Sequence, residues 1–276
     1  MIINVTDHTK YLYHYTRAET AINYILKDRT LRLSEYTSTN DPKETKAWRF
    51  SFFTTSEDLD LSDYSHEDMS AWLSSKLKRD TRLICFSQDT APLSGNHLED
   101  IFKRGFCKPR MWAQYADNHT GVCLVFDREK LQQQVVAQLK PYAPILHGPV
   151  RYGDHGIAED IFADQTFTIN CDELEKYGQD NYPLIHLLRH HHKLFFEKMS
   201  DWSAESEYRW IVFSKANTPI YLRYRHALAG IVFGEETAEE HKREIATITG
   251  GKSVELRGLK WKNHSPWFDF ERTGYK

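Results

Sequence analysis

The 276-residue sequence has no apolar run that approaches the roughly 18 residues needed to cross a bilayer. Its first ten residues, MIINVTDHTK, lack the basic segment followed by an apolar core that marks a secretory signal peptide. Both absences argue against membrane insertion and export. We therefore expect a soluble, cytoplasmic protein that has no membrane partner.

Cysteine is scarce, and no two cysteines form a C-x-x-C pair. The four cysteines are Cys85, Cys107, Cys123 and Cys171, and three of them fall in or beside apolar segments. This pattern is typical of reduced, buried thiols that behave as small hydrophobic residues. It argues against a zinc site and against a disulfide framework.

Neither sign of charge dominates the chain. Lys and Arg total 36, Asp and Glu total 39, and the formal net charge is −3. No global positive field is therefore present to attract nucleic acid. A local cluster around Lys103, Arg104, Lys108 and Arg110 is compatible with a basic groove and equally with a solvated loop.

Both glycine-rich phosphate loops, G-x-G-x-x-G and G-x-x-x-x-G-K-[ST], are missing, so a bound dinucleotide would need another kind of site. Internal repeats and low-complexity linkers are missing too. Strands and helices do not alternate regularly, which favours an α+β fold with a mixed or antiparallel sheet over a Rossmann fold. We expect one domain over 1–276, with helical insertions at about 56–80 and 157–200.

Apolar periodicity places the elements along the chain. It predicts strands at 11–15, 31–34, 83–87, 121–126, 150–152, 208–213, 220–223, 231–234 and 253–261. Helical spacing predicts helices at 18–26, from Lys43, in the second part of 56–80, and at 111–116, 128–139, 157–200 and 236–248. Thr16 and Glu19 fit a capping box at the start of the first helix, and 88–109 is predicted to be a long loop.

Three distant stretches carry residues suited to chemistry when they are read together. They are Leu12-Tyr13-His14-Tyr15-Thr16, the segment from Leu83-Ile84-Cys85-Phe86-Ser87 through Met111-Trp112-Ala113-Gln114-Tyr115, and Glu205-Ser206-Glu207-Tyr208-Arg209. Their order resembles the His-Tyr-Glu class of ADP-ribosyltransferases, which includes diphtheria toxin and the poly(ADP-ribose) polymerases. The likeness covers about 11–126 and 200–233. It implies an ADP-ribosyltransferase-like split sheet.

The chain also resembles an uncharacterised bacterial family that carries HYT, NDPxE, CFS, MWxxYxxxHxG and ExEYR. These motifs stand here at His14–Thr16, Asn40–Glu44, Cys85–Ser87, Met111–Gly121 and Glu205–Arg209. This second likeness spans nearly the whole chain, but it implies no activity.

The transferase resemblance implies that NAD is bound and consumed. Glu207 would stabilise the positive charge that develops when the nicotinamide–ribose bond breaks. The Tyr115 ring would stack on nicotinamide, and His14 with Thr16 would hold the ribose and the carboxamide. Tyr15 stands where the polymerases have glycine, so its ring is expected to narrow the pocket.

The same resemblance implies mono-ADP-ribosyl transfer to a macromolecule, either a nucleic-acid base or a protein side chain. Compact bacterial transferases of this kind often act as toxins or phage-defence effectors, so an antitoxin is one implied partner. His119 lies close to Tyr115 in sequence and is a candidate for contact with the pyrophosphate or for capping the strand at Gly121.

Alternatives from the residues themselves stay open. Glu205 competes with Glu207 for the catalytic role, because residues two apart on a strand share a face and close carboxylates shift each other's pKa. Either could instead pair with Lys193 or Lys198, and Glu207 could pair with Arg209. Two other functions remain: a non-catalytic nucleotide-binding module, and a metal-dependent nuclease built on Asp41, Glu44, Glu205 and Glu207.

The run Arg189-His190-His191-His192, with His186 one turn earlier, is more typical of a solvated helix face than of a metal site.

Overall fold

The computed structural model describes residues 2–154, 165–215, 218–250, 253–263 and 265–268. Part of the helical insertion predicted at 157–200 lies outside these residues. Within the described residues, no helix combines the length and the apolar character needed to cross a membrane.

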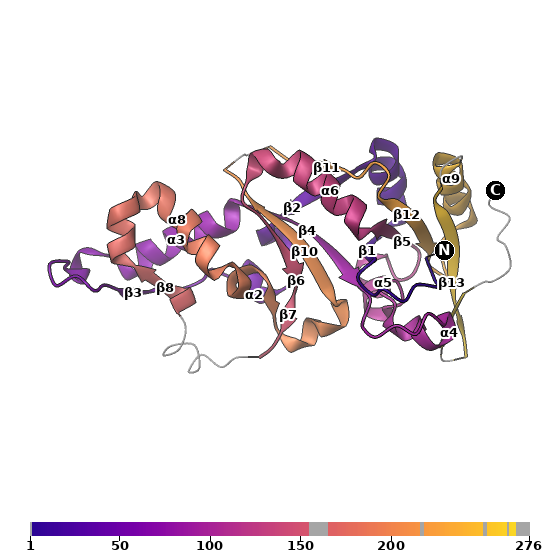
Figure 1. The fold of residues 1–276 in the computed structure, drawn as a ribbon, viewed down its shortest axis with the longest axis horizontal. Helices are drawn as coiled ribbons and strands as arrows, with labels where there is room; N and C mark the ends of the chain where they lie inside the picture. The colour runs from indigo at the N-terminus through magenta and orange to yellow at the C-terminus, as the bar shows by residue number, and fades with distance from the viewer. Residues whose placement is uncertain (1, 155–164, 216–217, 251–252, 264, 269–276) are drawn as a thin grey trace.

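Ten strands of the described chain form one mixed sheet at the centre of the molecule (Figure 1). Neighbouring strands are antiparallel except for the parallel pair β12–β13. The ten strands are β1 (Tyr11–Thr16), β2 (Thr30–Glu35), β4 (Thr81–Gln88), β5 (Val122–Asp127), β6 (Ile145–Pro149), β10 (Glu207–Phe213), β11 (Ile220–Arg223), β12 (Leu228–Phe233), β13 (Glu255–Lys262) and β14 (Ser265–Phe268). Two small parallel pairs are β3 (Ser51–Phe53) with β8 (Thr168–Asn170), and β7 (Arg151–Tyr152) with β9 (Glu197–Lys198).

Helices surround the sheet and extend the molecule at one end. The α-helices are α1 (Ala18–Thr20), α2 (Pro42–Thr45), α3 (His66–Arg79), α4 (His97–Asp100), α5 (Pro109–Tyr115), α6 (Arg128–Leu139), α8 (Cys171–Phe195) and α9 (Glu239–Thr249). A π-helical turn η1 (Ala21–Leu26) continues α1. Short 3₁₀ segments are η2 (Tyr36–Ser38), η3 (Leu61–Asp63), η4 (Ile101–Lys103), η5 (Lys140–Tyr142), η6 (Gln165–Phe167) and η7 (Ser200–Glu205).

The sheet splits on one edge of β4. Strand β10 pairs with β4 along its whole length on the other edge. On the split edge, β1 pairs only with Ser87 and Gln88, while β2 pairs only with Arg82 and Leu83. Between these two points the edge of β4 at Ile84–Phe86 has no strand partner in the described structure. A gap therefore opens in the middle of the sheet.

Strand alternation divides the core between the two faces of the sheet. On β1, Leu12 packs with α6, α9 and η1 on one face, whereas Tyr13 and Tyr15 pack with α5 on the other. A third cluster lies between α3, α8 and the sheet, and Figure 1 shows these helices at the end of the molecule opposite α9. The insertion helices thus share a hydrophobic cluster with β4 and β10, through Leu83 and Ile211.

The structure confirms the α+β class and the mixed sheet. The strands predicted at 11–15, 83–87, 121–126 and 208–213 appear as β1, β4, β5 and β10. An ADP-ribosyltransferase-like architecture stays a prediction.

Several local predictions were wrong. Thr16 ends β1 and caps no helix; Arg17 occupies the N-cap position and makes no side-chain capping bond. The segment 88–109, predicted to be a loop, contains α4 and η4. The described part of 157–200 is mainly helical as predicted, because α8 fills it between the short strands β8 and β9.

We predict that Leu124→Ala lowers the free energy of unfolding by about 2–5 kcal/mol, because it leaves a cavity in the centre of β5, where Leu124 is 0% exposed. Val136→Ala is the matched control, since Val136 on α6 is 52% exposed, and it should change stability by less than about 0.5 kcal/mol. Urea denaturation measures both. Equal effects of the two substitutions would contradict this view of the core.

Candidate functional site

A cavity of about 210 Å³ lies at the split of the sheet. The residues that line it come from β1, β2, the end of η2 and the loop after it, β4, α5, β9 and the η7–β10 junction. They include three groups that the sequence singled out from distant segments: His14, Tyr115 and the pair Glu205 and Glu207. The fold therefore brings the imidazole, the phenol ring and the carboxylates to one hollow.

His14 fills the gap between β1 and β4. Its Nδ1 lies 3.2 Å from the carbonyl oxygen of Cys85, at the edge of β4 that has no strand partner among the described residues. Because a carbonyl only accepts, Nδ1 carries the proton of this hydrogen bond. Burial lowers the pKa of His14, against the opposing effect of the Cys85 hydrogen bond, so the ring is neutral at pH 7. Its Nε2 is then an acceptor, suited to a hydroxyl group.

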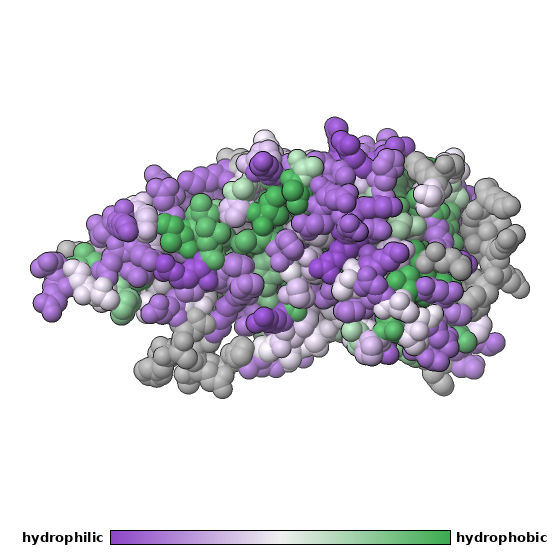
Figure 2. Space-filling view, viewed as in Figure 1, coloured by the Kyte–Doolittle hydropathy of each residue, from purple (hydrophilic) through white to green (hydrophobic). Residues whose placement is uncertain are grey.

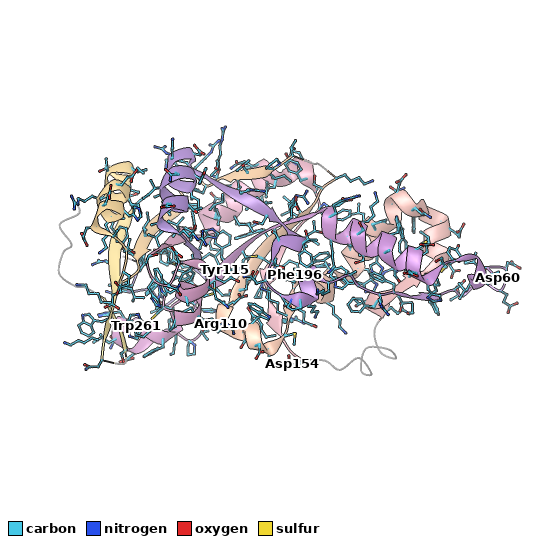
Figure 3. The ribbon with its side chains drawn as sticks, turned by 180° about the vertical axis from the view of Figure 1, so that it is seen from behind. Asp60, Arg110, Tyr115, Asp154, Phe196 and Trp261 are labelled. Carbon is cyan, nitrogen blue, oxygen red and sulfur yellow. The ribbon has the colours of Figure 1, made fainter. Side chains whose placement is uncertain are left out.

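Tyr115 and Glu205 are joined directly. The Tyr115 hydroxyl donates to Glu205 Oε1 at 2.8 Å, and Asn40 Nδ2 approaches the same hydroxyl at 3.5 Å. Burial, followed by the charge of Glu205, raises the pKa of Tyr115, so the phenol stays protonated. In Figure 3 Tyr115 lies near the middle of the molecule. The contact fixes the ring at the end of α5 against the acid of η7.

Glu207 is buried between two cations at the start of β10. Arg209 contacts it through Nε and Nη2, at 2.7 and 2.8 Å, and Lys198 Nζ lies 2.9 Å from Glu207 Oε2. Burial favours the neutral acid, but the charges of Arg209 and Lys198 outweigh it and hold the pKa of Glu207 far below its usual range. Glu207 is therefore an ionised carboxylate with both oxygens paired.

Lys198 bridges the two acids. Its Nζ lies 2.8 Å from Glu205 Oε2 as well as 2.9 Å from Glu207. Burial and then the charge of Glu207 raise the pKa of Glu205, although Lys198 opposes the shift. This direction agrees with the expectation that one acid raises the pKa of the other. The predicted pairing of both acids with Lys198 is confirmed.

The shared strand proposed for the two acids was wrong. Glu205 ends η7, Ser206 has a φ of +44°, and Glu207 begins β10. Both carboxylates nevertheless converge on Lys198.

Arg209 continues the series of charges to Glu44. Arg209 Nη1 lies 2.6 Å from Glu44 Oε1 and also donates to the carbonyl oxygen of Phe195. We call the series Glu44–Arg209–Glu207–Lys198–Glu205 the charge chain; all five residues are buried. It holds three acids and two bases, so with every group ionised it carries one surplus negative charge. Glu205, at its end, is the member that contacts Tyr115.

The other predicted cofactor residues lie in different places. Tyr15 borders the cavity, but its buried hydroxyl donates to the Gly105 carbonyl and its ring packs edge-on against Trp112. Thr16 lines a larger neighbouring cleft of about 980 Å³, which shares His14, Arg32 and Ser34 with the cavity.

The structure does not bring His119 to the cavity. Its ring stacks on Trp112 and contacts the edge of Trp261, which lies far from Tyr115 in Figure 3. The main chain of His119 accepts a hydrogen bond from Glu236 N, and a Cβ on Gly234 would approach the His119 carbonyl oxygen to 2.1 Å. This residue therefore packs the turn before β5 onto the turn after β12.

Sequence reasoning missed Cys85 as a site residue. Cys85 lines the cavity, pairs across the strands with Arg209, and donates its thiol hydrogen bond to Glu207. Burial and then the charge of Glu207 raise the pKa of this thiol well above its usual value, so it is protonated. The alternation of β4 places the Cys85 side chain on the other face of the sheet from Ile84 and Phe86. Only the register with β10 shows that this face carries the charge chain.

The acids proposed for a nuclease metal site contact protein cations instead. Arg209 lies between Glu44 and Glu207, and Lys198 lies between Glu207 and Glu205. Asp41 caps α2 by accepting from Lys43 N. Within the described residues, no group of three or more His, Cys, Asp or Glu side chains is arranged to hold a metal ion.

One family model matches the chain, over residues 111–210, and its description is "Protein of unknown function (DUF2971)". No curated protein and no solved structure gives a significant match. The matched segment contains Tyr115, Lys198, Glu205, Glu207 and Arg209, whereas His14 lies outside it. The match brings no activity, so the transferase resemblance stays a prediction.

We predict that Lys198→Met lowers the free energy of unfolding by about 3–5 kcal/mol at about pH 8, because it leaves two buried carboxylates without their shared cation. Removal of the cation raises the pKa of Glu205 further, so protonation relieves the repulsion as the pH falls. The deficit relative to the parent protein should therefore shrink between about pH 8 and pH 5.

Urea denaturation at the two pH values measures this difference. Lys176→Met, at an exposed position of α8, is the control and should have little effect at either pH. A deficit in Lys198→Met that does not change with pH would show that the two acids do not repel each other.

Proposed function

We propose that this protein cleaves the nicotinamide–ribose bond of NAD and transfers the ADP-ribosyl group to a macromolecule. One observation carries the proposal: His14, Tyr115 and Glu205 with Glu207 come from three distant segments and line one cavity. These are the residue types that the resemblance to His-Tyr-Glu ADP-ribosyltransferases requires. A role as a toxin or phage-defence effector, with an antitoxin partner, follows from the resemblance alone.

The charge of the site suits this reaction. Loss of nicotinamide leaves an oxocarbenium-like sugar with developing positive charge, which a fixed negative charge stabilises in a buried site. The charge chain supplies one surplus negative charge. Glu207 is neutralised by Arg209 and Lys198, and of the two end acids Glu205 lines the cavity whereas Glu44 does not, so we assign the negative charge that faces the cavity to Glu205. Glu205 is then the acid next to the reacting sugar, and Glu207 is a positioning residue that holds Lys198.

The shape of the site gives Tyr115 and His14 their roles. The Tyr115 ring lines the cavity and is held by Glu205, so it offers a fixed surface for the nicotinamide ring. His14 Nε2 is available to accept from a ribose hydroxyl.

The cavity volume is below the roughly 300–1,000 Å³ typical of pockets that enclose a whole ligand. We therefore place only the nicotinamide end of NAD there. The ADP part goes in the adjoining cleft beside Thr16 and Arg32.

We predict that the purified protein releases nicotinamide from NAD and that Glu205→Gln slows this release by about 100-fold or more, because the amide keeps the size of the side chain but removes its charge. Chromatographic measurement of nicotinamide follows the reaction. Glu240→Gln, at an exposed position of α9, is the matched control and should leave the rate unchanged.

Three outcomes of this experiment count against the proposal or part of it. Full activity of Glu205→Gln would show that the acid assigned to the sugar is the wrong one. Absence of nicotinamide release from the parent protein would reject the enzyme. If NAD then still raised the melting temperature, the cavity would be a non-catalytic nucleotide-binding site.

A further inference from the structure

A second cleft, of about 500 Å³, gathers cations and shares no lining residue with the cavity. It lies between the end of η1, the first turn of α6 and the turn that joins β11 to β12. Arg29, Lys130, Arg223 and Arg225 line it, together with His226, and Asp28 is the one acid among its lining residues. This local charge of +3 contrasts with the net charge of −3 for the whole chain.

These cations have no acidic side-chain partner among the described residues. Within the described residues, the side chains of Arg29, Lys130, Arg223 and Arg225 make no ion pair and no hydrogen bond, and all four are exposed. Buried cations elsewhere, such as Arg209 and Lys198, each contact a carboxylate. Exposed like charges repel one another, so a cluster of them favours an anionic partner.

The main chain fixes two of the arginines beside each other. Arg29 and Arg225 have φ values of +55° and +48°, in turns after η1 and β11. Tyr224 N donates to the carbonyl oxygen of Arg29 at 3.3 Å, which ties the two turns together. Lys130 comes from α6, and in Figure 2 the surface over the right-hand half of this helix is hydrophilic. Three separate elements therefore direct cations to one open surface.

Two exposed tyrosines stand next to the cations. Tyr24 on η1 is 65% exposed and Tyr221 on β11 is 54% exposed. Both line the neighbouring large cleft, which shares Asp28 and Arg223 with the cationic one. Because both rings are highly exposed, they lie at the rim of the large cleft, beside the cationic one. A basic groove with aromatic rings beside it is the usual surface for single-stranded nucleic acid, because phosphates meet cations while unpaired bases stack on rings.

We propose that this cationic cleft binds the phosphate backbone of a single-stranded nucleic acid, with bases stacked on Tyr24 and Tyr221. Dispersed, exposed cations suit a chain of phosphates better than one enclosed phosphate group. The aromatic rim favours unpaired bases over an acidic polypeptide. The inference concerns binding alone and needs no NAD cleavage, although Tyr24 and Tyr221 line the large cleft in which we place the ADP part of NAD.

The test is fluorescence anisotropy with a labelled single-stranded RNA of about 15 nucleotides, and with DNA of the same length in single- and double-stranded form. We expect the single strands to bind and their affinity to fall steeply with salt. The double variant Lys130→Glu with Arg225→Glu should weaken binding at least tenfold. It should also lower the slope of log affinity against log salt by about 1.4, since each lost phosphate contact contributes about 0.7.

A matched control separates the effect of the cleft on binding from the effect of net charge. Lys46→Glu with Lys176→Glu makes the same change in net charge at exposed positions away from the cleft, and it should change affinity less than twofold. Tyr221→Ala should weaken single-strand binding by about tenfold and leave the salt slope unchanged, because stacking does not release counterions. Circular dichroism verifies that each variant is folded.

The outcomes that overturn the proposal are distinct. No binding of single strands, or equal weakening by the cleft and control variants, would reject the cleft as a nucleic-acid site. Polyglutamate that competes as well as RNA would replace it with an acidic polypeptide, and pyrophosphate that competes fully at low concentration would replace it with a small phosphate ligand. Nicotinamide release, measured in parallel, separates failure of this inference from failure of the proposed enzyme.

Discussion

The charge chain is the constraint on which the site depends. Glu44 on α2, Arg209 and Glu207 on β10, Lys198 on β9 and Glu205 on η7 alternate in sign within a buried space. Removal of one member of such a series leaves an uncompensated buried charge, which costs several kcal/mol. Each member therefore fixes the next, and the elements that carry them are held around one edge of the cavity.

The split of the sheet supplies the space that the charge chain borders. Strands β1 and β2 contact β4 at opposite ends, so the carbonyl oxygen of Cys85 is left for His14. The position of the neutral imidazole thus follows from the sheet, and that of Tyr115 follows from its bond to Glu205. The cavity and the cationic cleft differ in how their charges are compensated. The charges beside the cavity pair with one another, whereas the cations of the cleft are exposed to solvent.

Several strands and candidate site residues could be predicted from the sequence, because short stretches of residues carry the signal. Alternation predicted β1 and apolar runs predicted β5 and β10, while the resemblance to the His-Tyr-Glu transferases, carried by the order of short motifs, brought His14, Tyr115 and Glu207 together as candidates. The rest depends on long-range pairing. The register of β4 with β10 places Cys85 opposite Arg209, and the left-handed Ser206 separates Glu205 from Glu207. Nearness in sequence also misled, because His119 follows Tyr115 by four residues yet packs on Trp112 and Trp261.

The central claim is that the charge chain leaves Glu205, not Glu207, as the acid that meets the ligand. A crystal structure of Glu205→Gln soaked with NAD addresses it most directly, since the slowed variant would retain intact NAD. The account predicts nicotinamide against the Tyr115 ring, its ribose beside residue 205, and Glu207 still held by Arg209 and Lys198. NAD bound elsewhere, or Glu207 released from Arg209 to contact the ribose, would contradict it.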